Sequence, residues 1–231
     1  MVVAEMKPFE EIKEMLKNYK NILVLGCGAC VAVCLTGGKR QVELLASALR
    51  MANKIDDNDV TVGERTLSRQ CEPKFIDQLR DDLHTYDVVL SMGCGAGVQE
   101  LAQKLGKIPV LPAMNTRFIG SADGEGNFTE MCAACGDCII AVTGGICPLA
   151  NCPKGLLNGP CGGTKDGKCE VSPDIPCAWV MIYERLKDLG KLDDIKKIMS
   201  PKKWSRNQRP GTYTVKEKSE GKDKAEKTVS K

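Results

Sequence analysis

The chain has 231 residues, enough for one domain of ordinary size with a small addition. A complete TIM barrel of about 250 residues accompanied by a second domain is therefore excluded. The thirteen cysteines need a chemical explanation, whereas a single histidine, His84, argues against mixed cysteine–histidine zinc sites and a histidine-dependent triad. The net charge of +3 is uneven, because residues 202–231 hold ten basic and four acidic side chains.

The N-terminal residues do not resemble a signal peptide, and no run approaches the roughly 18 apolar residues of a membrane span. We therefore expect a cytoplasmic protein without a membrane contact. Thiols stay reduced in that compartment, so clustered cysteines indicate metal or redox ligands rather than disulfides. Aromatic residues are few and do not alternate with basic runs, which argues against a nucleic-acid partner.

Apolar periodicity predicts a helix over residues 8–19, followed by short apolar runs that alternate with helical segments. The expected strands are 21–27, 59–66, 87–94 and 108–114, and the expected helices between them are 42–54, 73–86 and 96–106. Strands separated by helices of this length imply a parallel sheet with right-handed crossovers. The predicted fold class is α/β, with a small Rossmann-like or flavodoxin-like domain over residues 1–120.

The pattern changes after Phe118. Residues 131–177 contain eight cysteines with many Gly and Pro but no helical or strand period, so metal binding must stabilise them. A helix is expected over 178–190, stopped by Gly190, with a short one over 192–199. We thus predict an irregular cysteine-rich module with C-terminal helices over residues 121–200. The charged residues 201–231 are predicted to form a disordered tail.

The first group of cysteines follows the predicted strands. Cys27, Cys30 and Cys34 come at the end of the first strand, Cys71 after the second and Cys94 after the third. Because the carboxyl ends of parallel strands share one edge, we expect five thiols on one rim. The Cys-x2-Cys-x3-Cys spacing suits three ligands of a [4Fe-4S] cluster, with Cys94 or Cys71 as the fourth.

Two alternatives apply to this rim. The segment GCGACV begins like a dinucleotide-binding fingerprint, but Val31 replaces its third glycine, so a nucleotide is disfavoured. Cys71 taken alone could equally be a small buried apolar side chain. We therefore include Cys71 among the expected cofactor-binding residues but not among the expected metal ligands.

The second group of cysteines begins with Cys132-x2-Cys135-x2-Cys138, which is the core of bacterial ferredoxin ligation. Five more follow: Cys147, Cys152, Cys161, Cys169 and Cys177. Eight ligands permit two clusters, one cluster and one structural zinc, or two zinc ions. Linear order suggests pairing Cys177 with the first three and grouping the other four, although the two sets could interleave.

The segments CPLANCPKGLLNGPCGGTKDGKCEV and CAWVMIYERL, with GCGAC, RQCE and SMGCGAG upstream, resemble the cysteine-rich methylenetetrahydrofolate reductase C-terminal family, in particular its MetV-type iron-sulfur subunits. The resemblance extends over residues 20–190. It implies a hetero-oligomer with a MetF-type subunit, which would hold the flavin and the folate site, and a separate electron-donor protein. It also implies a role in one-carbon metabolism through the acetyl-CoA pathway.

The expected function is therefore that of a non-catalytic oxidoreductase subunit with two or three [4Fe-4S] clusters. It would pass electrons to the flavoprotein that reduces methylenetetrahydrofolate to methyltetrahydrofolate. The alternative is a zinc-binding scaffold of the same reductase without a redox role. No catalytic residue is expected in this chain, since His84 ends a predicted amphipathic helix and an electron relay needs cofactors rather than acid–base groups.

Overall fold

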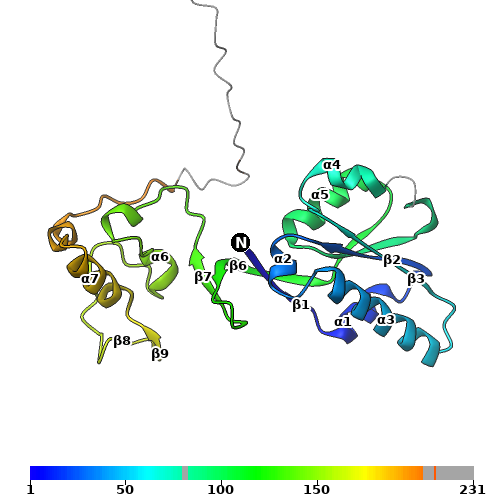
Figure 1. The fold of residues 1–231 in the computed structure, drawn as a ribbon, viewed down its shortest axis with the longest axis horizontal. Coiled ribbons are helices and arrows are strands. Elements are labelled where there is room, and N and C mark those ends of the chain that lie inside the picture. The colour runs from blue at the N-terminus through cyan, green and yellow to red at the C-terminus, as the bar shows by residue number, and fades with distance from the viewer. Residues whose placement is uncertain (80–82, 205–210, 212–231) are drawn as a thin grey trace, which may run out of the picture.

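The computed structural model describes residues 1–79, 83–204 and 211. It consists of an N-terminal α/β part and a cysteine-rich C-terminal part, with a three-stranded antiparallel sheet between them (Figure 1). Within the described residues, no helix is both long and apolar enough to cross a membrane. The predicted tail lies outside the described residues except for 201–204 and 211.

The α/β part is built on a four-stranded parallel sheet with the strand order β3-β2-β4-β5. Its strands are β2 (Asn21–Cys27), β3 (Thr61–Leu67), β4 (Val88–Met92) and β5 (Val110–Pro112). The central strand β2 is buried on both faces, with Ile22 and Val24 in one apolar core and Leu23 and Leu25 in the other. This explains its continuous apolar sequence and confirms the predicted α/β class.

Helices cover both faces of this sheet. α1 (Phe9–Leu16) and α3 (Lys39–Ile55) pack on one face through side chains such as Ile12 and Leu49. α5 (Gly95–Leu105) and the short α4 (Pro73–Ile76) pack on the other through Leu101 and Ile76. The arrangement is the doubly wound one that the alternation of strands and helices predicts.

One predicted helix is wrong. Residues 73–86 do not form a single helix but α4 followed by two 3-10 turns, Asp77–Leu79 and Leu83–Thr85, with residues 80–82 outside the described part. Ile76 and Leu79 remain buried against the sheet, and their spacing of three residues suits a 3-10 turn as well as an α-helix. Apolar spacing alone therefore did not separate the two conformations.

The antiparallel sheet has the order β1-β6-β7 and was not predicted. It contains β1 (Val2–Met6), β6 (Met114–Ala122) and β7 (Phe128–Cys132), and the last two form a hairpin. The domain boundary expected at residue 120 falls inside β6. In register, Val2 pairs with Ile119, and Ile119 pairs with Cys132, so the sheet runs from the α/β part to the first cysteine of the C-terminal part.

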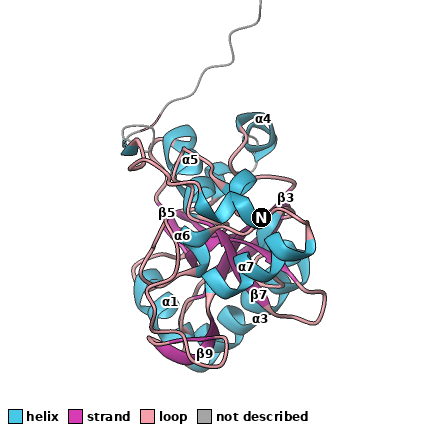
Figure 2. Ribbon diagram, turned by 90° about the vertical axis from the view of Figure 1, so that its left-hand side faces the viewer, coloured by secondary structure: helices cyan, strands magenta, loops and turns pink. Residues whose placement is uncertain are grey.

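The C-terminal part consists mainly of loops, as seen where it faces the viewer in Figure 2. Its regular elements include the 3-10 helix Ile140–Val142, α6 (Pro148–Asn151), the hairpin of β8 (Lys168–Cys169) and β9 (Ser172–Pro176), and α7 (Ala178–Asp188). The predicted helix over 178–190 is confirmed as α7, and Gly190 follows it with a φ of 65°. Residues 192–196 form a 3-10 helix.

Candidate metal-binding cysteine sites

The first site lies at the carboxyl ends of β2 and β4, where the strand order reverses. In open parallel sheets this is the place where ligands bind. Cys27 is the last residue of β2 and is buried, and Cys30 begins the short helix α2 (Cys30–Val33). Cys94 directly precedes α5, so its sulfur lies at the N-terminus of an eleven-residue helix, which favours negative charge.

Cys71 joins these thiols from the loop after β3. Burial of its sulfur raises the pKa of the Cys71 thiol, although part of the residue faces solvent, and the neighbouring thiol of Cys94 raises it further. Cys27 and Cys30 act in the same direction more weakly. All four residues lie at the carboxyl ends of β2, β3 and β4 or in the loops that follow these strands. We call Cys27, Cys30, Cys71 and Cys94 the rim set.

Cys34 points elsewhere. It is buried, and its Sγ donates to the Val2 carbonyl oxygen of β1 at 3.6 Å. Burial raises the pKa of the Cys34 thiol, and a hydrogen bond from the Ala4 backbone partly offsets this rise. The neighbouring Cys30 thiol also raises the pKa. The structure therefore places the Cys34 sulfur against β1, at the C-terminal end of α2.

A buried polar residue that the sequence analysis missed holds the rim loops in place. Gln70, next to Cys71, donates from Nε2 to the Leu25 carbonyl oxygen of β2 at 2.8 Å. Its Oε1 accepts from the Ser91 hydroxyl of β4 at 2.6 Å. Leu25 and Ser91 are paired in the sheet, so the Gln70 side chain ties the loop of Cys71 to both central strands.

The glycines of the SMGCGAG segment make room for this side chain. A Cβ added at Gly93 would lie 2.1 Å from Gln70 Oε1, and one at Gly97 would lie 2.8 Å from Gln70 Cβ. Neither distance is possible without a shift of Gln70. A lone glutamine is not a sequence signal by itself, but the glycine-rich segment around Cys94 indicated close packing.

The second site begins where β7 ends. Cys132 is the last residue of β7, and its Sγ accepts a hydrogen bond from the Ala134 N–H at 3.4 Å. Ala134 has a φ of 50°, in the left-handed region, so the chain turns sharply just after Cys132. Helix α6 packs against β7, and Cys147 directly precedes α6. We call Cys132, Cys135, Cys138 and Cys147 the loop set.

The remaining four cysteines line a single small cavity of about 20 Å3: Cys152, Cys161, Cys169 and Cys177. We call them the cavity set. The Gly163 N–H donates to Cys161 Sγ at 3.4 Å, and this hydrogen bond lowers the pKa of the Cys161 thiol. Desolvation acts to raise the pKa, and the nearby Lys154 lowers it further. Cys177 directly precedes α7, so its sulfur lies at the N-terminus of an eleven-residue helix. Cys177 thus lines a cavity with Cys152, Cys161 and Cys169, whereas linear order had suggested grouping it with Cys132, Cys135 and Cys138.

The donors in these sets fit a thiophilic metal. The members of each set are all thiols, and the sulfurs of Cys132 and Cys161 accept backbone N–H bonds of the kind that stabilise metal-bound thiolates. All thirteen cysteines are free thiols. Within residues 1–79, 83–204 and 211, however, no three His, Cys, Asp or Glu side chains lie close enough to hold an ion. Ligation therefore requires the thiols of a set to move together.

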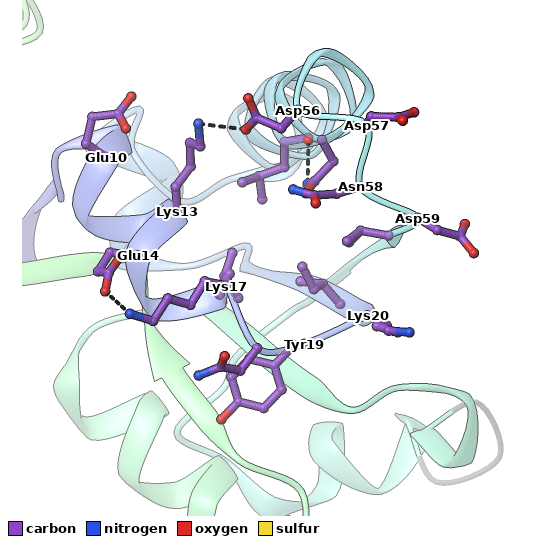
Figure 3. Close-up of a pocket in the computed structure, with 16 residues that line it drawn as sticks. Glu10, Lys13, Glu14, Lys17, Tyr19, Lys20, Asp56, Asp57, Asn58 and Asp59 are labelled. Atoms are coloured by element: carbon purple, nitrogen blue, oxygen red, sulfur yellow. Dashed lines mark hydrogen bonds and ion pairs between the residues drawn. The ribbon is translucent and has the colours of Figure 1, made fainter.

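A further cavity lies at the opposite end of the α/β part. It has a volume of about 760 Å3 and is bounded by the ends of α1 and α3 and the loop 56–60. Its charged walls are partly neutralised, since Lys13 pairs with Asp56 and Lys17 with Glu14 (Figure 3). It contains no cysteine and lies at the amino ends of the strands, so it does not belong to the thiol sites.

Comparison with known proteins gives one match. No curated protein and no solved structure matches the chain. Residues 111–205 match the family described as Methylene-tetrahydrofolate reductase C terminal. This segment contains β6, β7, the loop set and the cavity set, whereas the rim set precedes it. The C-terminal part of this chain is therefore similar to the methylenetetrahydrofolate reductase C-terminal family.

Proposed function

We propose that the chain is an iron-sulfur electron-transfer subunit that serves a flavoprotein in the reduction of methylenetetrahydrofolate to methyltetrahydrofolate. The observation that carries the proposal is that eight of the thirteen free thiols lie in the segment similar to the methylenetetrahydrofolate reductase C-terminal family, and that four of these eight line one cavity. Thiolate sets of four are the ligands that [4Fe-4S] clusters use.

The residues of this chain would bind and tune such clusters. A bound [4Fe-4S] cluster supplies one-electron transfer. The Ala134 and Gly163 N–H groups donate to sulfur and so offset negative charge on the ligands, and the helix N-termini next to Cys94 and Cys177 act in the same direction. We assign the flavin and the folate site to a MetF-type partner subunit, and the first electrons to a separate donor protein.

The metal content of the anaerobically purified full chain tests this proposal. We expect brown protein with broad absorption near ~400 nm and about four iron and four sulfide per occupied thiol set. Cys135→Ala should lose about four of these iron atoms, because one ligand of the loop set is removed. Protein that contains zinc alone, or wild-type iron content in Cys135→Ala, would contradict the proposal.

A single zinc ion is the second candidate at the cavity set. A cavity of about 20 Å3 has room for one water-sized sphere, which suits one ion rather than a cluster. Four thiolates form a closed tetrahedral zinc site that is structural and redox-silent. In that case elemental analysis should give one zinc together with the iron of the other sets, and Cys161→Ala should lose the zinc but no iron.

A pair of variants tests the ligands of the rim set. Because the Cys71 thiol lies with Cys27, Cys30 and Cys94, Cys71→Ala should lose about four iron atoms. Cys34→Ala is the matched control, since the Cys34 sulfur contacts the Val2 carbonyl oxygen of β1, and it should keep its iron. Iron and sulfide analysis of both proteins decides the point. Iron lost from Cys34→Ala and kept in Cys71→Ala would reverse the assignment.

A further inference from the structure

A buried lysine lies against the loop set. Lys202 is 7% exposed, and its Nζ donates to the Asp137 carbonyl oxygen in the loop between Cys135 and Cys138. The Cys135 Sγ lies 3.8 Å from the same oxygen. The Lys202 ammonium group, more than sixty residues away in sequence, therefore contacts the loop between Cys135 and Cys138.

The charge of Lys202 acts on the Cys135 sulfur. Partial burial tends to raise the pKa of the Cys135 thiol, but a backbone hydrogen bond with Asp137 and a hydrogen bond with Lys202 together outweigh it. The positive charge of Lys202 adds to them, and the pKa of the thiol is lowered. The environment thus favours negative charge on this sulfur.

The cavity set has a different charge balance. Lys154 lies near Cys161, but it forms an ion pair with Glu170, whose Oε1 also lies 3.6 Å from the Cys161 Sγ. The carboxylate offsets the ammonium there. Lys202 instead donates to a backbone carbonyl oxygen of the ligand loop, that of Asp137.

We infer that Lys202 is a positioning residue that stabilises the reduced state at the loop set, and so raises its reduction potential. The inference rests on the proposed function, since it requires a redox group held by Cys132, Cys135, Cys138 and Cys147. One electron from a donor makes the site more negative by one charge. The Lys202 ammonium group neither gains nor loses a proton in this step and offsets the added charge.

Substitution of Lys202 in the full chain tests the inference. Lys202→Met removes the charge, Lys202→Gln removes it but keeps an N–H donor, and Lys202→Arg keeps it. Lys203→Met is the matched control, because Lys203 is exposed and adjacent. The readout is a dithionite titration followed by electron paramagnetic resonance, with the loop-set signal identified as the one that Cys135→Ala loses.

We expect the two neutral variants to change the oxidised-to-reduced ratio of that signal about tenfold at a fixed potential, toward the oxidised form, which for a one-electron couple equals 59 mV. Lys202→Arg and Lys203→Met should stay near the wild type. An unchanged Lys202→Gln would overturn the inference, and so would loss of iron from both neutral variants, since Lys202 would then only hold the loop. Absence of iron from the wild type would instead refute the proposed function.

Discussion

Removal of metal from the purified chain by an anaerobic chelator is expected to unfold residues 132–199 and to leave the parallel sheet folded. The apolar cluster of the C-terminal part is small: among the described residues its buried members are Trp179, Ile182 and Leu186, against which six partly buried side chains pack. So small a core does not offset the conformational entropy of about seventy residues. We expect hydrogen exchange of α7 amides to accelerate at least about a hundredfold, which corresponds to about 2.8 kcal/mol.

The α/β part supplies the internal control for this experiment. Amides of β2 and α3 lie in or against two large apolar cores and should keep their protection in the metal-free chain. Reconstitution with iron and sulfide should restore the protection of α7. If α7 exchanged at the same rate with and without metal, the three buried side chains would suffice for folding, and metal would have no structural role in this part.

The fold of the α/β part was predictable because the apolar pattern of each segment shows which of its side chains are buried. β2 is apolar at nearly every position because both of its faces are covered, and helices such as α3 show a regular apolar face. β1 escaped prediction because its pairing partner β6 lies more than a hundred residues away, and only that partner makes Val2–Met6 a strand.

The grouping of the cysteines was predictable only in part. Cys27 and Cys94 both follow parallel strands, so they lie at the same edge of the sheet, and the sequence was sufficient to predict this placement. Placement of Cys177 next to Cys152 depends on how the β8–β9 hairpin and α7 fold back, for which the irregular sequence has no periodic signal. The contact of the Cys34 sulfur with the Val2 carbonyl oxygen likewise depends on β1, which has no signal in the local sequence.

Gln70→Ala is expected to destabilise the α/β part and to empty the rim set. The substitution leaves the Ser91 hydroxyl and the Leu25 carbonyl oxygen without their partner at a position that is 1% exposed. Each unsatisfied buried group costs about 1–3 kcal/mol, so we expect a loss of about 3 kcal/mol in the free energy of opening of β2 and β4. Hydrogen exchange of their amides measures it.

The same variant separates the role of Gln70 in the fold from its role in the site. Because Gln70 fixes the loop that carries Cys71, its loss should also remove about four iron atoms at a temperature where the sheet is still folded. Gln99→Ala is the matched control: Gln99 is exposed on α5 and donates only to the Gly95 carbonyl oxygen of its own helix. It should change stability by less than about 0.5 kcal/mol and keep its iron. Full iron content in a destabilised Gln70→Ala would mean that the rim thiols assemble without this buried amide.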